Sequence, residues 1–129
     1  MRWLDTNVIC SFLTDLDVEL QSRAAQILLD GETYFVADIV LLETVYVLSI
    51  CFRIPHKQVI ITLLDFLRQP FIQVQNPEEV LKALLLWRDH PQVDFADCLL
   101  ITRAAGADAK ALVSFDKHFS DLPCNLIQP

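Results

Sequence analysis

Met1-Arg2-Trp3-Leu4-Asp5-Thr6-Asn7 is the segment from which the fold class follows, because in it an apolar strand runs directly into an acid. Residues 2–4 are expected to form a short buried strand, and Asn7 is expected to cap a helix over 7–13. In open α/β sheets, ligands bind beyond the carboxyl ends of the parallel strands. Asp5 therefore lies where such a protein places its functional groups.

The rest of the chain repeats this alternation of strand and helix, with apolar residues at helical spacing between short runs of β-forming residues. Further helices are predicted over 18–29, 39–51, 56–67, 77–88 and 94–105, and further strands over 33–37, 71–74, 111–114 and 126–127. Asp38 is expected to cap the helix over 39–51. The alternation predicts an α/β fold with a central, mainly parallel sheet of four to five strands and helices on both faces.

The composition indicates a single packed domain over residues 1–129. Hydrophobic residues make up 53% of the chain and the mean hydropathy is +0.39, which excludes a disordered protein. The only glycines are Gly31 and Gly106, and so few of them disfavour a turn-rich all-β fold.

The expected compartment is the cytoplasm. Segment 35–52 has the length of a membrane span, but Asp38 and Glu43 would each cost about 2–3 kcal/mol at a bilayer centre. It is therefore expected to be a buried helix, with no membrane association. The first residues show no signal-peptide pattern. The cysteines form no CxxC or zinc spacing, so they are expected to be reduced thiols: Cys10, Cys51, Cys98 and Cys124.

The formal net charge is −7 and the pI is near 4.7. A non-specific nucleic-acid binder is usually basic, because neutralising phosphates drives such binding. The acidic balance therefore counts against nucleic acid as a partner, though less so where acids bind metal ions, which reverse the local charge. It also suits a basic protein partner.

The candidate functional residues are acids in apolar surroundings: Asp5, Glu43, Asp97 and Asp116. Glu43 is almost the only ionisable residue in its apolar helix. Burying a lone carboxylate is costly unless it is paired or bound to a metal. The alternatives are that Glu43 faces solvent or pairs with an arginine such as Arg53.

Asp94 and Asp97 are three residues apart and share a helix face. Asp94 has the alternative role of capping this helix, whereas Asp97 lies beside the apolar run that follows it. Asp116 follows the strand over 111–114. It either starts a turn or faces Asp5 from a neighbouring strand end, with Ser114 bonding an acid or a metal-bound water.

Converging carboxylates repel one another unless a cation lies between them. Mg²⁺ and Mn²⁺ prefer oxygen ligands, and they activate a bound water and stabilise charge on a phosphate, singly or as two ions about 3.5–4 Å apart. These acids therefore indicate metal-dependent phosphodiester chemistry. The histidines show no metal-ligand spacing and are expected to be secondary: His56, His90 and His118.

The residues around these acids resemble the PIN domain, and specifically the ribonuclease toxins of VapBC toxin–antitoxin modules. The resemblance runs in order along essentially the whole chain. It lies in Leu4-Asp5-Thr6-Asn7, Leu42-Glu43, Phe95-Ala96-Asp97-Cys98-Leu99-Leu100 and Val113-Ser114-Phe115-Asp116. It implies an α/β/α sandwich and a Mg²⁺- or Mn²⁺-dependent endoribonuclease that cleaves single-stranded or loop RNA by metal-activated water.

The resemblance also implies residue roles and partners. Asp5, Asp97 and Asp116 would hold the metal, and Glu43 would bind it or orient the water. Asp94 matches a further acid of many members, and Asn7 and Ser114 would have supporting roles. The implied partners are a second copy of the chain and a cognate antitoxin, whose tail would offer an arginine to the acids. Segments 40–50 and 59–67 would suit an antitoxin, unless both are simply core.

Two other interpretations remain open on the sequence alone. One is a PIN-like binding or regulatory module without catalytic activity. The other is a phosphoacceptor or phosphatase domain with an aspartate nucleophile. The latter fits poorly, because Lys117 and Ser114 crowd one strand end and Asn7 occupies the second position of a DxD motif.

Overall fold

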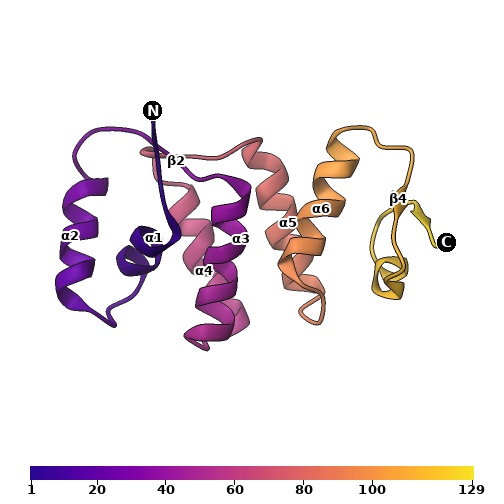
Figure 1. Ribbon diagram of the computed structural model, residues 1–129, viewed down its shortest axis with the longest axis horizontal. Helices are drawn as coiled ribbons and strands as arrows, with labels where there is room; N and C mark the ends of the chain where they lie inside the picture. The colour runs from indigo at the N-terminus through magenta and orange to yellow at the C-terminus, as the bar shows by residue number, and fades with distance from the viewer. The chain divides into compact units, whose positions relative to one another are not determined.

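The computed structural model describes residues 1–129 and divides them into two compact units, Met1–Pro77 and Glu78–Pro129. Each unit contains helices and parallel strands (Figure 1), so the predicted α/β class is confirmed. The single domain over 1–129 stays a prediction. None of the helices combines the length and the hydropathy that a membrane crossing requires.

The first unit alternates strands and helices along its whole length. Its elements are β1 (Arg2–Trp3), α1 (Thr6–Leu13), α2 (Val18–Leu28), β2 (Tyr34–Phe35), α3 (Asp38–Tyr46), η1 (Val47–Cys51), α4 (His56–Leu67) and β3 (Ile72–Gln73).

A parallel sheet in the order β1-β2-β3 organises this unit. The Leu4 N–H donates to the Phe35 carbonyl over 2.9 Å, which continues the ladder up to the residue before Asp5. Helix α1 lies between α2 and α3 (Figure 1). The core consists of apolar side chains that these helices and β2 bury almost completely: Ile9, Leu28, Val36, Leu41, Leu48, Val59 and Leu63.

Three predicted helix starts are wrong by one residue, since the helices predicted from 7, 39 and 94 begin at Thr6, Asp38 and Phe95. Asp5, not Asn7, caps α1, and Ala37 precedes α3, so that Asp38 is its first helical residue. The predicted helix over 39–51 also changes type. Its last five residues form the π-helix η1, in which the Phe52 N–H reaches back five residues to the Val47 carbonyl over 2.9 Å. A π-helical turn of this kind cannot be read from the apolar repeat of the sequence.

The second unit contains α5 (Pro77–Asp89), α6 (Phe95–Gly106), β4 (Leu112–Val113), η2 (Lys117–Asp121) and β5 (Leu126–Ile127). The rings of Trp87 and Phe95 meet at 5.7 Å between α5 and the start of α6. The loop between these helices is closed by the Val93 N–H, which donates to the His90 carbonyl over 3.0 Å. These contacts fix the start of α6, where Asp94 and Asp97 lie.

The predicted parallel pairing of strands is confirmed, although the sheet of the first unit has three strands, and β4 and β5 form a parallel pair within the second unit. The expectation that Asp5 and Asp116 follow neighbouring strands stays a prediction, because the two residues belong to different units. Each strand has only two residues, and local sequence does not specify which distant strand so short a segment selects.

Candidate functional site

Asp5 connects β1 to α1 and has a structural role of its own. Its extended backbone makes it the N-cap of α1, and its Oδ1 accepts a hydrogen bond from the Thr6 N–H over 2.8 Å. The helix begins here because a short acceptor side chain satisfies an amide that has no partner within the helix. The side chain is exposed, and Asn7 is exposed on the first turn that follows.

Glu43 lies on the exposed side of α3 and makes no ion pair, so the pairing with Arg53 that the sequence left open is not formed. Burial, with contributions from the charges of Glu43 and Cys51, raises the pKa of the Cys10 thiol on α1 to about 11. Glu43 is therefore within electrostatic reach of α1. Its carboxylate remains available to a ligand.

Asp94 and Asp97 mark the start of α6. Asp94 is the N-cap residue, the alternative that the sequence left open, and its carbonyl accepts hydrogen bonds from the Asp97 N–H over 3.0 Å and the Cys98 N–H over 3.2 Å. Its side chain makes no capping hydrogen bond. Asp94 thus has a capping backbone and a carboxylate that does not cap, which leaves that group available for a functional role.

The pKa of Asp97 is raised above its usual value. The first cause is burial, and the next are the negative charges of Asp94 and Asp116, while His118 acts in the opposite direction. Carboxylates of the second unit therefore influence one another through space. A divalent cation near Asp97 would relieve this repulsion, so the charges suit a metal ion.

The segment after β4 holds Asp116 in a network of short hydrogen bonds. The Asp116 N–H donates to Ser114 Oγ over 3.0 Å. Asp116 Oδ1 in turn accepts from the His118 N–H over 2.9 Å, which caps η2, and lies 2.9 Å from His118 Nδ1. Ser114 therefore orients the backbone of Asp116 and does not bond its carboxylate as the sequence suggested.

His118, which the sequence analysis treated as secondary, lies beside the candidate acid Asp116 in the structure. Metal-ligand spacing among histidines was the wrong signal. The informative signal was an acid followed two residues later by a histidine at the start of a helical turn, where the acid's side chain reaches the next turn's N–H groups.

The candidate residues divide between the units: Asp5, Asn7 and Glu43 belong to the first, and Asp94, Asp97, Ser114 and Asp116 to the second. Within each unit, three or more His, Cys, Asp or Glu side chains are nowhere gathered closely enough to hold a metal ion. By chemistry the donor set suits a hard divalent cation, because it offers carboxylate oxygens and no thiolate.

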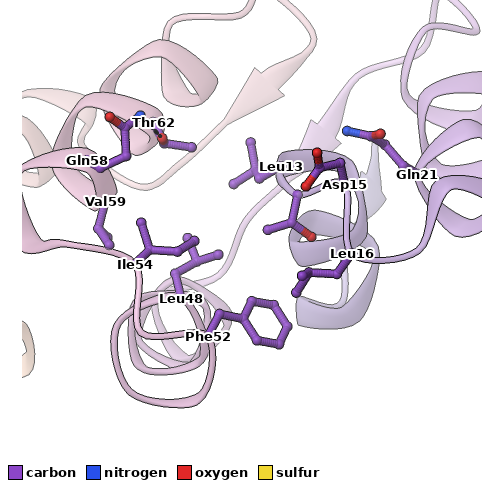
Figure 2. Close-up of a pocket in the computed structure, with 11 residues that line it drawn as sticks. Leu13, Asp15, Leu16, Gln21, Leu48, Phe52, Ile54, Gln58, Val59 and Thr62 are labelled. Carbon is purple, nitrogen blue, oxygen red and sulfur yellow. Dashed lines mark hydrogen bonds between the residues drawn. The ribbon is translucent and has the colours of Figure 1, made fainter.

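A groove of about 490 Å³ lies in the first unit, and none of the candidate acids lines it. Figure 2 shows apolar side chains facing it from the α1–α2 connection and from the η1–α4 segment, among them Leu16, Phe52 and Val59. The sequence suggested segments 40–50 and 59–67 as either partner surface or core, and both segments contain buried and exposed residues. Tyr46, Ile50 and Ile61 are more than half exposed.

Comparison with known proteins identifies the family. Residues 3–123 match the PIN domain, and the chain belongs to the PIN domain family. It is 25% identical over 132 residues to a VapC ribonuclease of Aquifex aeolicus, and the match covers 100% of this chain and 97% of that protein.

Two solved structures are similar at low identity. One is VapC20 of Mycobacterium tuberculosis, a toxin that cleaves the sarcin-ricin loop, with 15% identity, a TM-score of 0.45 and full coverage of both chains, 100% and 100%. The other is VapBC2 of Rickettsia felis bound to a DNA fragment of its promoter, with 19% identity, a TM-score of 0.40 and coverage of 98% and 97%.

Proposed function

We propose that this PIN domain protein is a metal-dependent endoribonuclease, the toxin of a toxin–antitoxin pair. The observation that carries the proposal is the family match over residues 3–123, a range that contains all four candidate acids. The relative from Aquifex aeolicus, named a ribonuclease and matched along the full chain, supports it.

In this proposal the reacting groups are Asp5, Glu43, Asp97 and Asp116, with Asp94 as a further acid. Asp97, Asp116 and Asp5 hold Mg²⁺ or Mn²⁺, and Glu43 binds the ion or orients the attacking water. When bound, the ion would lower the pKa of a water molecule and stabilise the negative charge on the phosphate. Asn7 and Ser114 support Asp5 and Asp116 through the first turn of α1 and the segment after β4.

The proposed substrate is single-stranded or loop RNA, and the net charge of −7 places a condition on its binding. A chain with this negative charge gains little affinity from electrostatic attraction to the RNA phosphates. RNA binding should therefore depend on the divalent cation, and EDTA should weaken binding as well as abolish cleavage.

We further propose that a cognate antitoxin covers the acids with an arginine and seats an apolar segment in the groove beside Phe52 and Val59, and that the toxin is a homodimer. The groove's apolar lining and the exposed acids Asp5 and Glu43 support these partners. Hydrogen exchange with and without purified antitoxin tests the docking. Absence of protection over 13–21 and 48–62 would rule it out, and light scattering gives the oligomeric state.

The decisive experiment compares the wild type with Asp5→Asn and Asp97→Asn, using Asp65→Asn as an acid outside the candidate set. Each protein is induced in cells without antitoxin, and total RNA is sequenced for new 5′ ends. The wild type and Asp65→Asn should produce the same discrete cuts. The other two variants should lose roughly 10²–10⁴ of the rate on purified target RNA.

Equal cleavage by all four proteins would refute the assignment of these acids. Mn²⁺ binding without any cleavage would instead favour a PIN-like binding or regulatory module. Labelling of Asp5 by acetyl phosphate would favour the phosphoacceptor interpretation.

A further inference from the structure

A second groove of the first unit lies between α1 and α2 and has a volume of about 240 Å³. On each helix its lining residues are spaced by three or four positions, so each helix contributes one face. The residues that lie along this Arg23 groove include Asn7 and Ser11 from α1, and Leu20, Arg23, Ala24 and Ile27 from α2.

The polar side chains of the Arg23 groove have no partner within the chain. Arg23 makes no ion pair, although Glu19 precedes it by one helical turn. Asn7 and Ser11 make no side-chain hydrogen bond. Three other arginines of the chain are paired with acids. In a chain of net charge −7, the Arg23 guanidinium is therefore an open binding group for an anion.

The remainder of the Arg23 groove is apolar. Ala24 is 4% exposed and forms the buried base of the groove with a small side chain. Leu20 and Ile27 are 42% and 48% exposed, so both leave apolar surface open to solvent beside the guanidinium. A ligand that matches this lining combines an anionic group with a flat, largely apolar part. A nucleotide has both, in its phosphate and its base.

We propose that the Arg23 groove binds one nucleotide of the RNA substrate, with the phosphate on Arg23 and the base between Leu20 and Ile27. The side chains of Asn7 and Ser11 offer hydrogen bonds to the ribose or to the edge of the base. The inference rests on the proposed function, because it takes RNA to be the substrate. Asn7 lies two residues after Asp5, on the first turn of α1, so the groove begins next to a candidate catalytic acid.

Two variants of Arg23 separate its charge from its size. Arg23→Gln removes the charge, whereas Arg23→Lys keeps it. Arg68→Gln is the matched control, because Arg68 is an exposed arginine of the same unit that makes no ion pair and lies outside the groove. Arg23→Gln and Arg68→Gln change the net charge equally, so a difference between them reports the position of the charge. Arg23 is exposed, so its replacement leaves the core intact.

The test titrates the isotope-labelled full chain with hexauridine RNA in Mg²⁺ and follows the amide signals by NMR. Hexauridine should shift signals of residues 7–11 and 20–27. It should bind Arg23→Gln about 10-fold more weakly than the wild type, which is the effect of losing a hydrogen bond to a charged group. Arg68→Gln should stay within about 3-fold of the wild type.

The salt dependence of the same titration identifies the phosphate contact. The slope of log affinity against log salt concentration should become shallower by about 0.7 in Arg23→Gln, the value for one phosphate of a single strand. Arg23→Lys should keep the wild-type slope. Inorganic phosphate, titrated separately, should bind at least about 10-fold more weakly than hexauridine, because it lacks the base.

The outcomes separate this inference from the proposed function. Equal binding of hexauridine by the wild type and Arg23→Gln would overturn the role of the groove and leave the nuclease standing, as would equal affinity for inorganic phosphate. No hexauridine shifts over 20–27, with protection of that segment by the antitoxin, would make the groove a protein-binding site and also overturn it. Binding that depends on Arg23, in a protein that cuts no RNA in cells, would support the groove and contradict the proposed function.

Discussion

Arg103 on α6 donates to Glu79 on α5 over 2.9 Å, with 17% and 18% of the two side chains exposed. This ion pair links the two helices of the second unit, the later of which begins with Asp94 and Asp97. Its shielding from water makes it a stronger contact than the exposed pair of Arg88 and Asp89.

Removing one member of this pair should destabilise the protein. Arg103→Ala leaves the Glu79 carboxylate largely buried without its partner, and the expected loss is about 2 kcal/mol of unfolding free energy. Urea unfolding followed by circular dichroism measures it. The double variant Arg103→Met/Glu79→Leu should recover most of the loss, whereas Arg88→Ala should change stability by less than about 0.5 kcal/mol.

Gly106 should respond to substitution according to whether Glu79 is present. A Cβ at position 106 would overlap the Glu79 carboxylate, with Cδ only 2.7 Å away, so Gly106→Ala must displace a group that the ion pair holds. Alanine is otherwise the better helix former by about 1 kcal/mol. Gly106→Ala should therefore destabilise the wild type and stabilise the Glu79→Ala variant. Thermal unfolding of the four proteins measures both effects, and the same sign in both backgrounds would contradict the overlap.

The cysteines should differ sharply in reactivity. Cys51 is exposed, whereas Cys10 and Cys98 are buried and their pKa values are raised to about 11 by burial. At pH 8, only about one in a thousand of such thiols is ionised. In the native protein a thiol reagent should modify Cys51 first, and Cys51→Ser should remove this fast phase. Rapid labelling of Cys98 without denaturant would contradict its burial.

Asp97 should make the stability of the metal-free protein depend on pH. Because its folded pKa is raised above the unfolded value, the folded protein binds this proton first as the pH falls. The stability contributed by Asp97 therefore increases as the pH falls from neutral through the folded pKa, until the unfolded value of about 3.9 is reached. Measured in EDTA, the wild type should gain stability relative to Asp97→Asn between pH 7 and pH 4. A difference independent of pH would contradict the shift.

The helices were predictable because their boundaries are marked locally. Pro55 and Pro70 flank the segment predicted as 56–67, and the structure has α4 at His56–Leu67. A proline cannot continue the hydrogen-bond ladder of a helix, so it marks where one begins or ends. Which strands pair with one another was not predictable, because it depends on contacts between segments far apart in the chain.

The orientation of Glu43 was not predictable for a different reason. Helix α3 is apolar around most of its circumference, so hydrophobicity gives no indication of which face is buried. In the structure Ile39, Tyr46 and Ile50 are 75%, 57% and 60% exposed, at helical spacing with Glu43. Glu43, which the sequence analysis treated as costly to bury, is therefore exposed beside apolar side chains. Likewise, the contact of His118 with Asp116 depends on a side-chain position that sequence does not give.

The capping bond that Asp5 makes at α1 allows chemistry and folding to be separated at one position. Asparagine caps helices as well as aspartate does, since it too has an oxygen to accept the Thr6 N–H. Under the proposed function, Asp5→Asn should therefore give a protein of native stability that lacks nuclease activity, a form that can be crystallised with an uncut substrate. Asp5→Ala would sacrifice about 1 kcal/mol of helix stability together with the carboxylate. Under the same proposal, such an inert but correctly folded variant could also be produced in quantity without an antitoxin.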